Sequence, residues 1–200
     1  MKKLFVLATL LISTLGCAQK EETTFKKEGL ENVMVTKENQ PITFAEILKK
    51  YVQGIPKTWS DAAIFRYNNF IVSEEGNFDD IFKRLSRANF DYVTFGANEV
   101  LSVFENRASK LKTLEIESKL LIFYPFPLVF YVNPTMPELA KRVEEGLQII
   151  TASGELDAIF NNYYSDIVDT LQMDKRTLFV LDNPLIPNEF ANLQPNLVEL

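Results

Sequence analysis

Short apolar runs alternate with amphipathic helical patterns along most of this chain, and this alternation constrains the fold more than any other feature. The clearest helical stripe has apolar residues at positions i, i+3, i+4 and i+7, namely Phe78, Ile81, Phe82 and Leu85. The β-branched and aromatic residues of the next run, 91–95, are typical of a strand. Repetition of this pattern predicts an α/β domain with a largely parallel sheet, and the clustering of helices late in the chain leaves an α+β arrangement open.

The remaining elements follow from the same periodicities and from turn residues. Helices are predicted over about 43–52, 60–67, 97–107, 137–153 and 155–164. Strands are predicted over 70–72, 113–117, 120–124, 128–132 and 176–181. The capping box Thr43 to Glu46 opens the first helix, and Gly154 is in the position of a helix C-cap. The run 128–132 lacks polar residues, so we expect it to be a strand buried on both faces.

The N-terminal segment has the features of a signal peptide. Lys2 and Lys3 precede an apolar run from Leu4 to Leu15. This run is too short to cross a bilayer core, which needs about 20 helical residues. We therefore expect export of the chain to the cell envelope of a bacterium.

Two processing routes remain open for this segment. One is cleavage before Cys17 with a lipid attached to the Cys17 thiol, and the other is ordinary cleavage after Ala18. We favour lipidation, because Gly16 and Cys17 resemble the end of the bacterial lipoprotein box. The predicted organisation is then a signal peptide over 1–16, a polar tether over 17–28 and a folded domain over 29–200, anchored to the membrane only through the lipid.

Composition excludes several classes of function. The chain has no histidine and one cysteine, so a histidine-based active site, a histidine zinc site and an intrachain disulfide are unavailable. The formal net charge is −6, and removal of residues 1–16 takes two lysines and makes it −8. Such a charge disfavours nucleic acid and anionic lipid as partners. Because no carboxylate pair stands out for acid–base chemistry, we expect a binding protein without a cofactor and not an enzyme.

Several segments together resemble the extracellular solute-binding proteins of family 3, the amino-acid-binding type with the two-lobed type-2 periplasmic-binding-protein fold. The matches occur in the order of the family: Gly54 to Ile64 with Trp59 and Asp61, Phe78 to Phe82, Phe90 to Tyr92, Gly96 with Glu99, Leu121 to Pro127, Phe130 to Val132, Leu139 to Leu147, Gly154, Phe160, Arg176 and Asn183 to Pro187. The resemblance covers roughly 29–187.

The resemblance implies a type-2 periplasmic-binding-protein-like fold with one nearly complete lobe and a partial second lobe. Full-length members of the family are longer, and their opening strand and helix units have no counterpart here. Phe95 also stands where the family motif has an arginine, so a cationic group that would meet an anionic ligand is missing.

Two turns carry the candidate ligand-binding residues. The first turn contains Thr58, Trp59, Ser60 and Asp61. Here an indole wall, a hydroxyl and backbone amides at a helix N-terminus would hold a carboxylate, and Asp61 would meet an amine. The structural alternative is that Ser60 or Asp61 caps the helix and Trp59 is a partly buried packing residue.

The second turn lies at the end of the predicted strand 91–95. Its candidate residues are Tyr92, Thr94, Asn98 and Glu99. The alternative is that Glu99 is at a helix start because the helix dipole favours a carboxylate there.

Two functions follow from these residues and from the resemblance. In the first, the chain reversibly binds a small polar or amino-acid-like solute, with a membrane transporter or another envelope protein as partner. In the second, it does not bind solutes and meets another protein through an apolar surface that the missing units would cover. A solute-binding protein should direct both turns into one concave pocket.

Overall fold

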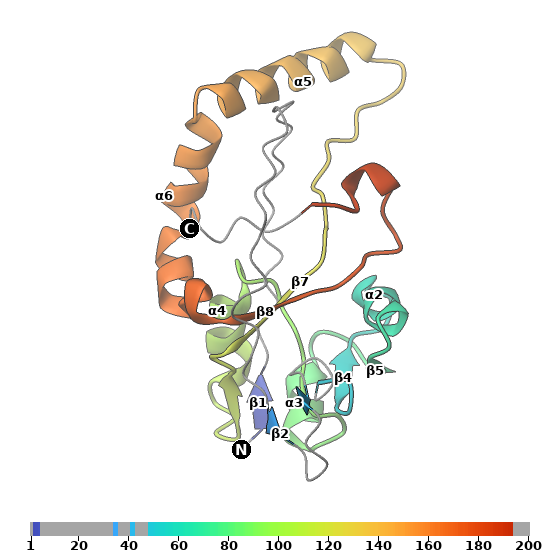
Figure 1. The fold of residues 1–200 in the computed structure, drawn as a ribbon, viewed down its shortest axis with the longest axis vertical. Coiled ribbons are helices and arrows are strands. Elements are labelled where there is room, and N and C mark those ends of the chain that lie inside the picture. The colour runs from blue at the N-terminus through green and yellow to red at the C-terminus, as the bar shows by residue number, and fades with distance from the viewer. Residues whose placement is uncertain (1, 5–33, 36–40, 43–47, 194–200) are drawn as a thin grey trace.

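The computed structural model describes residues 2–4, 34–35, 41–42 and 48–193 (Figure 1). Cys17, the tether 17–28 and the capping box 43–46 lie outside the described residues. The described strands are β1 (Lys2–Leu4), β2 (Met34–Val35), β3 (Pro41–Ile42), β4 (Val52–Ile55), β5 (Ile71–Glu74), β6 (Leu114–Ile116), β7 (Leu120–Phe123) and β8 (Thr177–Val180). The helices are α2 (Asp61–Tyr67), α3 (Ile81–Ser86), α4 (Val100–Val103), η1 (Phe104–Ala108), α5 (Pro137–Ala152), α6 (Glu155–Leu171), η2 (Met173–Lys175) and η3 (Asn188–Phe190).

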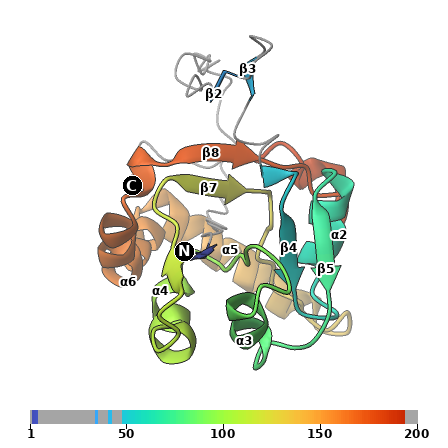
Figure 2. The same cartoon turned by 90° about the horizontal axis from the view of Figure 1, so that it is seen from below.

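The described residues form a mixed α/β protein with small parallel sheets. β4 pairs in parallel with β5 from Val52↔Ile71 to Ile55↔Glu74, and α2 makes the crossover between them. β7 pairs in parallel with β8 from Leu120↔Thr177 to Phe123↔Val180, with α5 and α6 in the long connection. Figure 2 shows these two strand pairs with α2, α3 and α4 around them. The predicted α/β class is confirmed at this level.

Two further strand pairs involve the N-terminal part of the chain. β1, which lies within the predicted signal peptide, pairs in parallel with β6, and Lys2 is opposite Leu114. β2 and β3 form an antiparallel pair in which Met34 is opposite Ile42. Each of the four described sheets has two strands.

Two hydrophobic clusters form the interior. One is built around α3, η1 and the end of α6, and the predicted α3 stripe is confirmed because Ile81, Phe82 and Leu85 are buried in it. The other lies between α2 and the β7–β8 pair and contains Ile64 and Phe65. Such burial of Leu, Ile and Phe side chains contributes roughly 1.5–3 kcal/mol each to folding.

Three of the predicted elements near the first cluster are wrong in part. Residue 52, predicted to end a helix, begins the strand β4 instead, because β5 and the chain near Tyr92 offer its backbone partners on both sides. Only Tyr92 in the predicted strand 91–95 forms a bridge, to Gln53. The helix predicted from Ala97 begins at Val100 and continues as the π-helix η1.

The run 128–132 is not the buried strand that its composition predicts. Its residues have no ladder partner among the described residues, and the chain connects β7 to α5 in an extended form (Figure 1). Leu128 is 66% exposed, Phe130 71% and Tyr131 95%. The apolar side chains of this run therefore meet solvent, whereas all four residues of β7 are buried.

The two long helices agree with the prediction in position and differ in burial. Gly154 has a left-handed backbone (φ 74°) between α5 and α6, as expected for a C-cap. No side chain of α5 is buried. α6 continues to Leu171, and its buried residues are Val168 and Leu171. The helical spacing of Leu156, Ile159 and Phe160 predicts that these side chains are buried, and this prediction is wrong. The helices therefore contact the body mainly through the last turns of α6.

Arg176 joins the end of α6 to the β6–β7 connection. Its side chain is buried, Nε donates a hydrogen bond to the carbonyl of Leu171 (2.6 Å), and Nη1 donates to the carbonyls of Glu117 (2.7 Å) and Leu120 (3.2 Å). Burial lowers the pKa of Arg176, and the nearby Glu117 charge opposes that shift. These bonds satisfy three carbonyl groups at the point where β8 enters its sheet.

Candidate functional site

The first predicted ligand turn is held in place by aromatic packing. The Trp59 ring stacks on Phe78 and meets the edge of Phe95, with ring centroids 6.1 Å apart in both pairs. Thr58 has a left-handed backbone (φ 74°), and its N–H donates a hydrogen bond to Glu74 Oε1 (3.3 Å). Trp59 is half-buried in this arrangement. The indole thus packs as the structural alternative described, with only part of its surface open to a ligand.

Two polar groups of that turn, the Ser60 carbonyl and the Asp61 carboxylate, are also engaged within the chain. The carbonyl of Ser60 accepts bonds from Ala63 N (3.0 Å) and Ile64 N (3.3 Å), and the Ser60 side chain makes no cap bond. The carboxylate of Asp61 accepts a hydrogen bond from the Tyr124 hydroxyl. Burial, with the nearby Asp61 charge, raises the pKa of Tyr124, so this hydroxyl stays a donor. An arriving amine would have to compete with Tyr124 for Asp61.

A carboxylate–guanidinium pair closes the outer side of the same turn. Arg66 Nη1 donates to Glu74 Oε2 at 2.6 Å, and this bond is the main reason why the pKa of Glu74 lies below its ordinary value. Arg66 and Glu74 therefore compensate each other beside the Trp59 turn, and the Lys57 charge also acts on Glu74.

The second predicted turn divides into buried and exposed parts. Tyr92 is fully buried, and burial together with the Asp91 charge raises its pKa. Thr94 is also buried, and its hydroxyl accepts a hydrogen bond from Gln53 Nε2 (2.8 Å). Tyr92 and Thr94 therefore belong to the interior, where a solute from the surface does not reach them.

Asn98 and Glu99 are exposed at the surface. Glu99 Oε1 accepts a hydrogen bond from Gly96 N (3.2 Å), and Gly96 O accepts from Val100 N (2.9 Å). The carboxylate is thus bonded to the backbone of its own turn, and it makes no cap hydrogen bond to α4. A Cβ on Gly96 would lie 2.5 Å from Asn98 Oδ1, so the absence of a side chain at Gly96 lets Asn98 fold back over the turn.

The two turns meet through their aromatic rings. Trp59 touches Phe95 at the end of the second turn, as given above. The polar candidates do not converge, because Asp61 is directed to Tyr124 and Thr94 to Gln53. A solute-binding protein is expected to direct donors of both turns into one pocket. Here the two turns contact each other through aromatic rings instead.

An apolar cavity lies elsewhere, between the second turn and α6. Its volume is about 200 Å³. It is lined by Ala97, Asn98, Leu128, Leu156, Ile159, Phe160, Tyr164, Ile167, Val168 and Met173. Asn98 is the one lining residue that the sequence analysis proposed for ligand binding. The Asn98 amide and the Tyr164 hydroxyl are the polar side-chain groups of the lining.

The sequence analysis missed most of this lining because it assigned the α6 stripe to the core. Leu156, Phe160, Tyr164 and Ile167 recur at helical spacing, which is the pattern of a buried face. In the structure they are half-buried and border an open cavity. The sequence does not tell where the run 128–132 lies relative to α6. In the structure, Leu128 is the residue of this run that lines the cavity.

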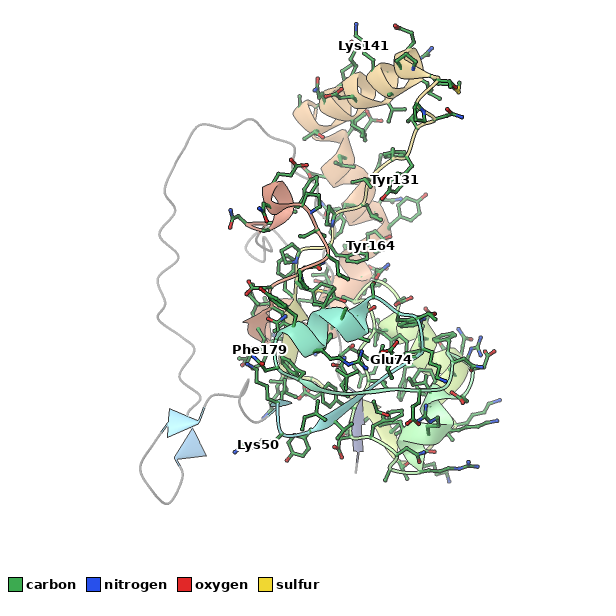
Figure 3. The ribbon with its side chains drawn as sticks, turned by 90° about the vertical axis from the view of Figure 1, so that its right-hand side faces the viewer. Lys50, Glu74, Tyr131, Lys141, Tyr164 and Phe179 are labelled. Atoms are coloured by element: carbon green, nitrogen blue, oxygen red, sulfur yellow. The ribbon has the colours of Figure 1, made fainter. Side chains whose placement is uncertain are left out.

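The exposed run is the largest apolar feature next to this cavity. Figure 3 shows Tyr131 and Tyr164 in the region between α5 and α2. The sequence pattern of α6 also predicts that the pair Tyr163 and Tyr164 belongs to the core, and this is wrong for Tyr163, which is 71% exposed. Aromatic side chains exposed in this number are characteristic of surfaces that bind other molecules.

Other kinds of site have little support within the part of the chain that the structure describes. There, no three Asp, Glu, His or Cys side chains gather as metal ligands would. No helix among the described residues combines the length and the apolar character needed to cross a membrane.

Comparison with known protein families, curated proteins and solved structures finds no match to this chain. The resemblance to family 3 solute-binding proteins therefore rests on the segments quoted from the sequence alone.

Proposed function

We propose that this chain is a protein-interaction module that presents the apolar run Phe126–Val132 to a protein partner. The observation that carries the proposal is the exposure of this run, in which Leu128, Phe130 and Tyr131 are more than half exposed. Soluble proteins rarely leave a continuous apolar surface open unless it binds something. This proposal is the second of the two functions inferred from the sequence, contact with another protein through an apolar surface.

The engagement of the predicted ligand residues supports this choice over solute capture. Asp61 is bonded to Tyr124, Thr94 to Gln53 and Glu99 to Gly96, so each has a partner within the chain. A solute would have to break these bonds to bind in the predicted way. A protein partner that covers Phe126–Val132 would leave them intact.

The proposal includes the type-2 periplasmic-binding-protein-like fold and the envelope location as its setting. In a chain with one nearly complete lobe and a partial second lobe, the run after β7 would lack part of its cover. A lipid on Cys17 would place the module at a membrane surface, where an envelope protein or a transporter subunit is the partner class.

Site-specific photo-crosslinking in the producing cells tests this proposal. A benzoylphenylalanine at position 131 should give one discrete adduct, and Phe130→Glu in the same chain should abolish it. The matched control is the photo-reactive residue at Tyr67, which is 60% exposed on α2 and outside the run. No adduct from position 131, or equal adducts from both positions, contradicts the proposal.

Solute binding is a second candidate, and the cavity beside Asn98 favours it. A volume of about 200 Å³ has room for a small amino-acid-like molecule whose apolar side chain faces α6. The Asn98 amide would bind its polar end. In this mode the ligand lies against α6 and not at the Trp59 turn.

Thermal unfolding of the full chain with a panel of amino acids tests the second candidate. A ligand at 100 times its Kd adds about 2.7 kcal/mol to the free energy of unfolding, which raises the midpoint by roughly 5 to 10 °C. Asn98→Ala should remove the shift and Asn106→Ala, on the exposed surface of η1, should keep it. Since Trp59 is the single tryptophan, unchanged Trp59 fluorescence on binding would place the ligand away from the first turn. A midpoint that no compound moves contradicts this candidate.

A further inference from the structure

The backbone of the run Phe126–Val132 lacks hydrogen-bond partners where a strand would have them. Among the described residues, no backbone–backbone hydrogen bond is formed by residues 126–132, although the chain is extended there (Figure 1). The Asn183 side chain bonds the carbonyl of Pro125, just before the run. An extended, unpaired apolar segment offers an edge onto which another strand can be added.

The charge distribution favours a second copy of the same chain as the added strand. The chain carries a formal net charge of −6, so two copies repel each other over most of their surface. Residues 126–136 contain no charged side chain, and contact between two such segments therefore brings no like charges together. Acidic or basic partners gain nothing electrostatically from this segment.

The exposed apolar area also matches what a dimer requires. The large apolar side chains exposed in and directly after the run are Phe126, Leu128, Val129, Phe130, Tyr131, Met136 and Leu139. With about 150–250 Å² for each fully exposed large side chain, their exposed area is on the order of 800 Å². A stable interface buries about 800 Å² on each partner.

We propose that Phe126–Val132 is the interface of a two-fold dimer, in which the run pairs antiparallel with the same run of a second copy. The inference rests on the proposed interaction function and names the partner. A two-fold axis normal to an antiparallel pair places one residue opposite its own copy. Pro127 has no N–H to donate, so the ladder is confined to 128–132. The midpoint of 128–132 is Phe130, and Leu128 of one copy therefore lies opposite Val132 of the other.

This pairing provides partners for unpaired backbone groups of the run and covers its exposed apolar side chains. Every second residue of each copy exchanges its N–H and C=O hydrogen bonds with the other copy, as in any antiparallel ladder. Cross-strand contacts of Phe130 with Phe130, and of Val129 with Tyr131, add aromatic and β-branched packing. The cavity beside Leu128 then lies next to the dimer interface and is closed on one more side.

Disulfide trapping in the purified full chain tests the arrangement position by position. Cys17 is replaced by Ser, and single cysteines are placed at Leu128, Phe130 and Val132, with Tyr67→Cys as the exposed control. Cysteines form a disulfide when their Cα atoms are about 4.4–6.8 Å apart. Position 130 should cross-link to its own copy, whereas 128 and 132 lie about 13 Å from their own copies in this register and should not, since a strand rises about 3.3 Å per residue.

The outcomes separate the inference from the proposed function. Strong trapping at 130 with weak trapping at 128, 132 and 67 supports the dimer. Equal trapping along the run indicates parallel or non-specific association and overturns it. Absence of trapping at 130 overturns it as well, and if photo-crosslinking at 131 still yields an adduct of another protein, the interaction function stands with a different partner.

Sedimentation velocity of the full chain gives an independent measurement. The Tyr131→Glu variant places two carboxylates at the interface and should raise the dimer Kd at least 10-fold, whereas Tyr67→Glu should leave it unchanged. Because Tyr131 is 95% exposed, Tyr131→Glu does not disturb the interior, and its far-UV circular dichroism should equal that of the parent. A monomeric parent, or equal dimerisation of the Tyr131→Glu variant, overturns the inference. Association that appears only with phosphatidylcholine vesicles also overturns it, because the run would then bind a lipid surface.

Discussion

The hydroxyl of Tyr124, directly after β7, donates a hydrogen bond to the carboxylate of Asp61 at the start of α2. The two residues are 63 positions apart in the chain. Their bond fastens α2 to the β7–β8 pair across the cluster that contains Phe65, whose ring meets the Tyr124 ring edge to face at 6.2 Å. It also occupies the carboxylate that the sequence suggested for amine recognition.

Removal of this bond should destabilise the chain measurably. Tyr124→Phe keeps the buried ring and loses the hydroxyl, so we expect a loss of about 1.5 kcal/mol in the free energy of unfolding in urea. Tyr67→Phe, at an exposed position, should stay within about 0.5 kcal/mol of the parent. In a double-mutant cycle with Asp61→Asn, additive losses would show that the two residues do not interact.

Stability should fall in alkaline solution because of two buried tyrosines. Burial is the main reason why the folded-state pKa values of Tyr92 and Tyr124 lie above the ordinary value of 10.0. Their contribution is fully present below pH 10. Above it the unfolded chain loses these protons and the folded chain keeps them, so the free energy of unfolding decreases by up to about 1.4 kcal/mol per pH unit for each group.

Urea unfolding between pH 8 and 11 measures this effect. The parent and Tyr67→Phe should lose stability above pH 10 with the same slope, and Tyr124→Phe should show a smaller slope. A parent whose midpoint is the same at pH 9 and pH 11 would contradict the assignment.

Arg176 should be among the most sensitive positions of the fold. Arg176→Met deletes the three hydrogen bonds to the carbonyls of Leu171, Glu117 and Leu120 and leaves those acceptors in a buried place. We expect a loss of about 3 kcal/mol, since each unsatisfied buried group costs about 1–3 kcal/mol. Lys141→Met removes an exposed ion pair on α5 and should cost under about 0.5 kcal/mol. Similar losses for both variants would refute the role of Arg176.

Two glycines should respond in opposite directions to alanine. A Cβ at Gly54 would lie 2.3 Å from the ring of the buried Phe90, so Gly54→Ala should lower stability by about 1–3 kcal/mol. Gly146 lies inside α5 with no atom within 4 Å of an added Cβ. Gly146→Ala should therefore raise stability by about 0.5–1 kcal/mol through helix propensity. Equal effects of the two changes on the melting temperature would contradict this account.

The local elements were predictable where a single periodicity dominates. The α3 stripe, the strand residues of β7 and β8 and the left-handed Gly154 all follow from nearest neighbours along the chain. The strand β4 was not predictable in this way, because its residues Val52 to Ile55 include a glycine and a glutamine. Gln53 can be buried there because its side chain donates a hydrogen bond to the Thr94 hydroxyl and its backbone forms a bridge with Tyr92.

The candidate site shows the same division. Residue types and turns pointed to Trp59, Asp61 and Thr94 as ligand-binding residues, and this stays a prediction. Their partners Phe78, Tyr124 and Gln53 come from distant parts of the chain. Whether a polar side chain is available to a ligand depends on whether such a partner is present. That condition is a property of packing and has no local signature.

By itself, the sequence determined the α/β class, the order of most helices and strands and the absence of histidine chemistry, because these depend on local periodicity and composition. The tertiary structure decided which apolar segments are covered. The run 128–132 and the α3 stripe are similarly apolar, yet only the stripe is buried. The stripe lies within a hydrophobic cluster, whereas the run borders α6 only through the cavity that Leu128 lines. Burial depends on contact between two surfaces, and a surface that no described part of the chain covers is available to another molecule.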